Sequence, residues 1–79
     1  MSTLEKYNSV FAAAFNVHAA VLNDDFNSKS VDKWDSITQL SLVTAMEDEF
    51  DIMMDTEDIL GFNSYAGGKD IVSKYGVNF

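Results

Sequence analysis

The tripeptide Asp35-Ser36-Ile37 is the part of this 79-residue chain whose side chains most clearly indicate chemistry. It stands at the start of an amphipathic run, 37–50, in which apolar residues recur at helical spacing. A serine in the first turn of such a helix presents an exposed primary hydroxyl to which another group can be attached. The chain has no cysteine and one histidine, His18, and it contains no nucleophile-elbow pattern. These residues predict a point of attachment and no self-contained active site.

Asp35 is predicted to cap the helix that begins at Ser36. Its carboxylate can accept backbone hydrogen bonds from the first turn, which leaves the Ser36 hydroxyl free to point outward. An anionic group on Ser36 lies beside the positive end of the helix dipole, where negative charge is stabilised. An Asp-Ser pair before an amphipathic helix is also an ordinary cap without further chemistry, so the pair by itself leaves both interpretations open.

The segment 36–50 has the clearest helical pattern of the chain, with two stripes of different character. The predicted core stripe consists of Leu40, Leu42, Val43, Met46 and Phe50. The second stripe consists of Ile37, Ser41, Thr44 and Asp48, with Glu47 at its edge. We expect this second stripe to be the exposed surface that a partner protein contacts.

Two further segments lie before this helix. A helix over 3–16 is predicted, with an apolar face made of Leu4, Tyr7, Val10, Phe11, Ala14 and Phe15. Residues 17–35 are rich in Asn, Asp and Ser and predict a long loop, with a short helical turn around 18–22. The residues expected to anchor the loop to the core are Val21, Leu22, Phe26 and Val31.

Two shorter helices are predicted after the segment 36–50. An extended connector, 51–55, leads to a short helix that begins near Thr56. A last helix is capped by Ser64 and ends near Lys74, before Gly76. The sequence therefore predicts an all-α fold: a small four-helix bundle with three longer helices, one short helix and a long loop between helices one and two.

Length and composition limit the classes of protein to be considered. Residues 1–79 suffice for a single domain with no second core. Without cysteine there is no disulfide framework and no thiolate metal site, and no run of about 18 apolar residues is present to span a membrane. The N-terminus lacks the basic and apolar regions of a signal peptide. We expect a cytoplasmic monomer without membrane insertion.

The formal net charge of −8 is large for this length. It disfavours nucleic acid, which is bound through Lys and Arg contacts to phosphate, and docking on anionic lipid headgroups. It favours partners with basic patches, with acidity for solubility alone as the alternative. Residues 47–58 contain seven carboxylates without calcium-loop spacing, so they predict a solvated, partner-facing surface and no metal site.

The string Trp34-Asp35-Ser36-Ile37, with the Leu-Ser-Leu-Val step at 40–43 and Glu-Asp-Glu-Phe at 47–50, resembles the acyl carrier proteins and their relatives, the peptidyl carriers. In this family the serine of an Asp-Ser-Leu motif carries a 4′-phosphopantetheine arm. Ile37 stands here in place of the usual leucine and keeps its bulk and apolarity. The resemblance is dense over 34–52, looser over 56–77, and mostly a matter of helix pattern over 4–15.

The resemblance implies a non-catalytic acyl carrier protein with 4′-phosphopantetheine on Ser36. Such a carrier holds acyl intermediates as thioesters and presents them to enzymes of fatty-acid, polyketide or related biosynthesis. The implied partners are a phosphopantetheinyl transferase and acyl-transferring, condensing or adenylating enzymes with basic docking patches. Fatty-acid carriers commonly have acidic residues at the positions of Thr38 and Ser41, which are neutral here. Together with Trp34 before the motif, this favours a discrete, pathway-specialised member.

Several alternatives accompany this prediction. One is a peptidyl or aminoacyl carrier protein loaded by an adenylating enzyme, and another is an acidic helical adaptor without a prosthetic group. A hydrolase built on Ser36 and His18 is disfavoured, because nothing resembles an oxyanion loop, and His18 is predicted to lie on a surface loop. Met46, Met53 and Met54 could line a cavity for a flexible acyl chain. Trp34 is expected to pack over the junction of loop and helix, with contact to the arm as the alternative.

Overall fold

Four α-helices and one 3₁₀ turn form the regular structure of this chain, of which the computed structural model describes residues 2–79. The elements in chain order are α1 (Thr3–Phe15), the 3₁₀ turn η1 (Ala19–Val21), α2 (Ser36–Phe50), α3 (Thr56–Gly61) and α4 (Tyr65–Ser73). Over the described residues the only extended pairing is an isolated antiparallel bridge between Asn27 and Ser64. The predicted all-α fold, with three longer helices, one short helix and a long loop before α2, is confirmed.

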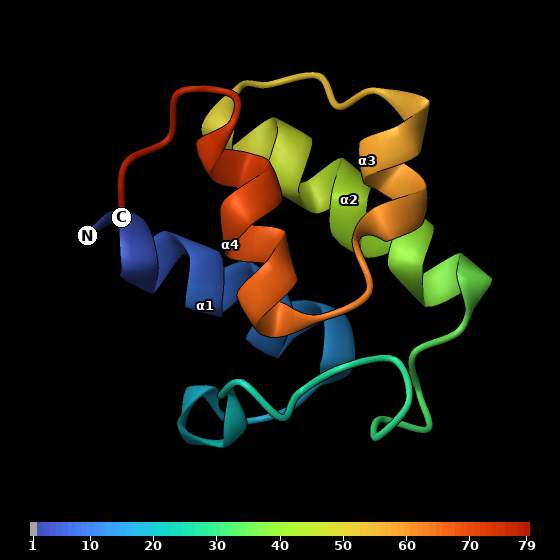
Figure 1. Cartoon of the computed structure of the whole chain (residues 1–79). Helices are drawn as coiled ribbons and strands as arrows, with labels where there is room; N and C mark the ends of the chain where they lie inside the picture. Colours follow the sequence, from blue (N-terminus) through green and yellow to red (C-terminus); the bar gives the residue numbers. More distant parts are fainter. Residues whose placement is uncertain (1) are drawn as a thin grey trace.

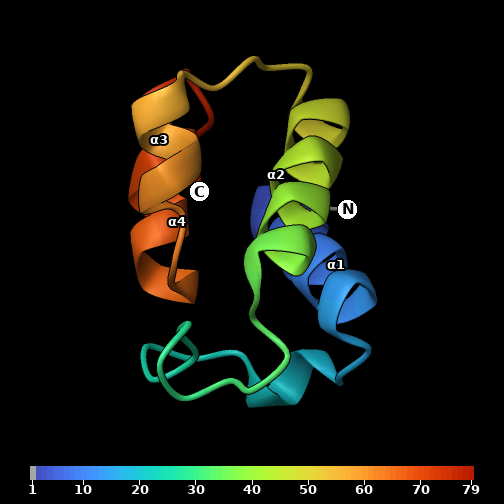
Figure 2. The same cartoon turned by 90° about the vertical axis from the view of Figure 1, so that its right-hand side faces the viewer.

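The helices are arranged on two sides of the molecule. α1 packs against α2 on one side, and α3 and α4 lie together on the other (Figure 2). The connector 51–55 joins the two sides at one end, and the loop before α2 closes the opposite end (Figure 1). The start of α2 therefore emerges from the loop at the edge of the bundle, where its first turn is accessible.

Local capping sets the helix ends. The Ser2 hydroxyl accepts the Glu5 N–H at 3.1 Å, and the Glu5 carboxylate accepts the Ser2 N–H in return, which forms a capping box at the start of α1. α1 ends one residue earlier than predicted because Asn16 takes the left-handed conformation, with φ 54°. At the start of α4, the Ser64 hydroxyl accepts the Gly67 N–H at 2.9 Å.

The core is a cluster of mainly aromatic side chains. Its buried members are Tyr7, Phe11, Phe15, Phe26, Trp34, Leu42, Val43, Met46, Met54, Phe62, Tyr65 and Val72. Phe11 lies at the centre, with its ring centroid 5.0–6.0 Å from the centroids of six other aromatic rings. The Tyr7 hydroxyl donates to the Tyr65 carbonyl at 2.6 Å, and burial raises the pKa of Tyr7. The inward faces predicted for the first two long helices are confirmed at their central residues.

Three apolar residues predicted to face the core or to anchor the loop are exposed. Leu40 is 57% exposed because the six-residue α3 is too short to cover this edge of α2. Leu4 is 41% exposed in the first turn of α1, at the end of the bundle. Val21 is 47% exposed in η1, where Leu22 and Phe26 make the contacts with the core instead.

A partly exposed ion pair connects α3 to the end of α4. The Asp58 carboxylate accepts the Lys74 ammonium group at 2.6 Å and the Tyr75 hydroxyl. The Tyr75 oxygen in turn accepts the Asp55 N–H at 2.9 Å. The hydrogen bond from Lys74, followed by that from Tyr75, lowers the pKa of Asp58. The prediction that the acidic stretch 47–58 is uniformly solvated is therefore wrong at Asp58, which is buried between two helices.

Truncating Leu42 tests the core of α2. Leu42 has no exposed surface, so Leu42→Ala is expected to lower the free energy of unfolding by about 2–5 kcal/mol through lost burial and the cavity left behind. Urea denaturation measures this change. Leu40→Ala removes the same atoms from an exposed site on the same helix and should cost much less. Equal losses for the two variants would contradict the assignment of these faces.

Asp58→Asn tests the ion pair between α3 and α4. Because folding lowers the pKa of Asp58, its contribution is complete above the unfolded pKa of about 3.9 and is lost as the pH falls through the folded value. The variant should therefore melt below the wild type at neutral pH and converge with it as the pH falls below the unfolded pKa. Circular dichroism melts measure this difference. Asp24→Asn, on an exposed loop, is the control for net charge, and a constant gap across the range argues against the pair.

Candidate functional site

Asp35 positions the first turn of α2. Its backbone is extended, with φ −109° and ψ −179°, and its Oδ1 accepts the Thr38 N–H at 2.8 Å, so the helix begins at Ser36. This backbone hydrogen bond is the main cause that lowers the pKa of Asp35. The carboxylate is therefore ionised near neutral pH and occupied by the backbone.

Ser36 is the first residue of α2 and is exposed to solvent. Within residues 2–79, no hydrogen bond engages its hydroxyl, because the cap is formed by the neighbouring Asp35. The next residue, Ile37, is also exposed, at 77%. The first-turn N–H groups give this end of the helix a partial positive charge, which favours an anion. An accessible nucleophile thus stands at a position suited to carry a phosphate.

A mainly apolar pocket of about 310 Å³ adjoins Ser36 at the edge between α2 and α3. Its other lining residues are Gln39, Leu40, Ile59 and Leu60. The exposure of Leu40, which departs from the sequence-based expectation, provides one wall of this pocket. The site therefore combines a free hydroxyl with a nearby apolar pocket.

Gln39 is a site residue that the sequence did not reveal. Its Nε2 donates to the carbonyls of Ile59 at 2.8 Å and Leu60 at 3.4 Å, at the end of α3. Its Oε1 accepts the indole N–H of Trp34 at 3.3 Å. Gln39 thereby joins the loop, α2 and α3 beside Ser36. The available signal was an amide side chain at a position of the helical wheel that points inward, next to Val43 and Leu42.

Trp34 closes the junction between the loop and α2. Its ring centroid lies 4.9 Å from that of Phe15, 5.9 Å from that of Phe11 and 6.0 Å from that of Phe26. The ring is buried and does not line the pocket beside Ser36. The expectation that Trp34 packs over this junction agrees with its position.

Most of the predicted partner surface lies on one exposed face of α2. Ser41, Thr44 and Asp48 are exposed there together with Ile37. Glu47 differs, because it is only partly exposed and its Oε2 accepts the Met54 N–H at 2.9 Å. Its carboxylate holds the connector 51–55 against the end of α2, so the solvated role expected for it applies only in part.

The remaining candidates lie away from Ser36. His18 is exposed and flanks η1, in the loop. Met46 and Met54 are packed in the core while Met53 is 85% exposed, so the three methionines do not line a common cavity. Within the described part of the chain, no group of three or more potential ligands could hold a metal ion, and no helix has the length and apolarity needed to cross a membrane.

Comparison with known proteins yields a likeness of fold. No family model matches the sequence, and no curated protein matches it. Among solved structures, the chain is similar to the solution NMR structure of a holo acyl carrier protein from Geobacter metallireducens, with a TM-score of 0.78 and 23% sequence identity. The match covers 95% of this chain and 86% of that one. The predicted likeness to the carrier proteins is thus confirmed at the level of the fold: this chain has the helical fold of an acyl carrier protein.

Proposed function

We propose that this chain is an acyl carrier protein in which Ser36 bears 4′-phosphopantetheine. The observation that carries the proposal is the exposed, uncommitted hydroxyl of Ser36 at the start of α2. The fold supports it, since the similar structure from Geobacter metallireducens is a holo acyl carrier protein. Such a carrier needs no catalytic groups of its own, because the modifying transferase can supply the base.

The residues around Ser36 fit this prosthetic group. Its phosphate, joined to the Ser36 oxygen, would lie at the positive end of α2, where the Asp35 carboxylate is already held by the Thr38 N–H. The pocket formed with Leu40 and Leu60 offers apolar surface close to the attachment point. When bound, the group supplies a terminal thiol that holds acyl groups as thioesters, so the absence of cysteine from the chain is no obstacle.

Attachment requires little of the chain beyond presentation of the hydroxyl. The Ser36 oxygen attacks the phosphorus next to the pantetheine of coenzyme A, and the phosphoanhydride bond to the nucleotide breaks. The nucleotide 3′,5′-bisphosphate leaves, and the hydroxyl proton passes to a base of the transferase. The exposed position of Ser36 at a helix end gives such an enzyme access to the hydroxyl.

The carrier acts by presentation to successive enzymes. A tethered cargo meets each partner at high effective concentration without release into solution. The proposed docking face consists of Ile37, Ser41, Thr44 and Asp48, with Glu47 at its edge. Partners with basic patches suit this face, and docking should weaken with added salt because exposed charge pairs are screened. The neutral Thr38 and Ser41 favour a role in a dedicated pathway.

The attachment site is tested by modification in vitro. Wild-type protein incubated with coenzyme A and a broad-specificity phosphopantetheinyl transferase should gain the mass of one phosphopantetheine group. Ser36→Ala should show no gain, and Ser28→Ala, which removes an exposed loop hydroxyl, should be modified like the wild type. Intact-protein mass spectrometry measures all three.

Two outcomes decide between the alternatives. A folded wild-type protein that stays unmodified would favour the acidic adaptor without a prosthetic group. If modification succeeds, mass spectrometry of the thioester isolated from the native host separates an acyl cargo from an aminoacyl or peptidyl cargo.

The docking face is tested by charge reversal at Asp48. Asp48→Lys should lower the kcat/KM of the transferase by about 3- to 10-fold, because the complementary field that steers encounter is weakened. Asp24→Lys makes the same charge change on an exposed loop and should have little effect. Circular dichroism checks that both variants remain helical. Equal rates for Asp48→Lys and the wild type would remove Asp48 from the docking face.

A further inference from the structure

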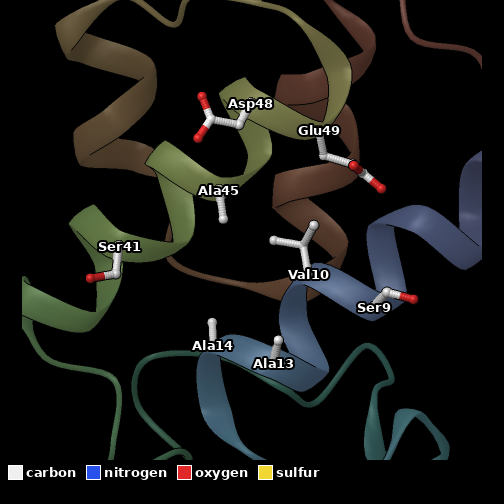
Figure 3. Close-up of a pocket in the computed structure, with 8 residues that line it drawn as sticks. All are labelled: Ser9, Val10, Ala13, Ala14, Ser41, Ala45, Asp48 and Glu49. Carbon is white, nitrogen blue, oxygen red and sulfur yellow. The ribbon is translucent and has the colours of Figure 1, made fainter.

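A second hollow lies on the opposite edge of α2, between α2 and α1. This groove has a volume of about 530 Å³ (Figure 3). Val10 and Ala14 point into it from α1, and Ala45 points toward them from α2 (Figure 3). Ala13 is exposed on the α1 side, and Ser41 borders the groove on the α2 side.

The lining of the groove has the chemistry of a surface on which another helix can pack. Its floor is made of methyl and isopropyl groups from Val10, Ala13, Ala14 and Ala45. Side chains this small permit close approach of a third helix, since the separation of packed helices depends on the side chains at the contact. An amphipathic helix laid in such a groove buries apolar residues spaced three and four apart.

Charge at the end of the groove limits what can occupy it. Asp48 and Glu49 stand together there, both exposed (Figure 3). No ion pair within residues 2–79 engages either carboxylate. Over their whole length, α1 and α2 carry four carboxylates and one lysine. The groove thus has an apolar floor and a negatively charged rim.

Several occupants are disfavoured by this charge. A second copy of the chain would bring the same net charge of −8 into contact with itself. Nucleic acid and anionic lipid surfaces would be repelled in the same way. A helix with an aliphatic stripe flanked by Lys or Arg can pack the stripe on the apolar floor and pair its charges with Asp48 and Glu49. We propose that the α1–α2 groove docks a basic amphipathic helix of a partner protein.

This surface is distinct from the attachment site. Ser36 borders the pocket between α2 and α3, whereas the groove lies on the edge of α2 that faces α1. Glu49 is roughly 20 Å along the helix from Ser36 at the usual rise per residue. The groove shares Ser41 and Asp48 with the proposed docking face, so a partner seated in it leaves Ser36 uncovered but competes with enzymes that dock through those two residues. The proposal holds whether or not Ser36 is modified.

The test is an NMR titration of the unmodified full chain with a synthetic helical peptide. The peptide carries Leu and Ala along one stripe and Lys on its flanks, and a matched peptide carries Glu in place of each Lys. Binding of the basic peptide should shift the amide signals of Ser9, Val10, Ala13 and Ala45. Ala13→Trp fills the groove and Glu49→Lys reverses its rim, and each should weaken binding by about tenfold.

Matched controls make the outcome decisive. Ala20→Trp and Asp24→Lys place the same changes on the exposed turn and loop, and both should bind the basic peptide like the wild type. Ser36→Ala should also bind it normally, which separates this test from that of the proposed function. Shifts centred outside the groove, equal affinity for the acidic peptide, or wild-type binding by Glu49→Lys would each overturn the proposal. If Ala13→Trp does not fold, Glu49→Lys alone decides.

Discussion

The packing of aromatic rings around Phe11 is the constraint on which the rest of the structure depends. A chain of this size buries little apolar area, and large rings supply much of it. The rings that meet Phe11 come from α1, from the loop before α2 and from the segment around the start of α4. Because Phe26 and Trp34 belong to this cluster, the long loop has fixed points in the core. The loop in turn determines where α2 begins.

The site is therefore anchored to the core on one side, and its hydroxyl is exposed to solvent on the other. Trp34 packs among the aromatic rings, and the Asp35 carboxylate accepts the Thr38 N–H. Ser36 follows, with a hydroxyl that makes no hydrogen bond within the described residues. Gln39, in the first turns of α2, donates a hydrogen bond to the Ile59 carbonyl near the end of α3. Packed and hydrogen-bonded neighbours around one free oxygen suit the proposed attachment of a mobile group to Ser36. The two edges of α2 then offer different surfaces, one toward α3 and one toward α1.

The features that were predicted correctly depend on local physics. The bounds of α2 follow from the Asp35 cap and from apolar spacing within one helix, so residues 36–50 could be assigned from the sequence. The exposure of Leu40 could not, because it depends on how far the short α3 reaches. Likewise, the sequence places Glu47 and Asp58 in a solvated acidic run. In the structure Glu47 accepts the Met54 N–H, and Asp58 accepts the Lys74 ammonium group. Contacts between different elements are not encoded in the hydrophobic periodicity of the sequence, so that pattern does not predict them.

The hydrogen bonds of Gln39 have a consequence for the fluorescence of the protein. Trp34 is the sole tryptophan of the chain, and its indole N–H is bonded to the same amide that holds the end of α3. Any movement of α3 away from α2 changes the polarity and hydrogen bonding around that indole. Its intrinsic fluorescence is thus a built-in reporter of what happens next to Ser36, and it needs no dye or isotope.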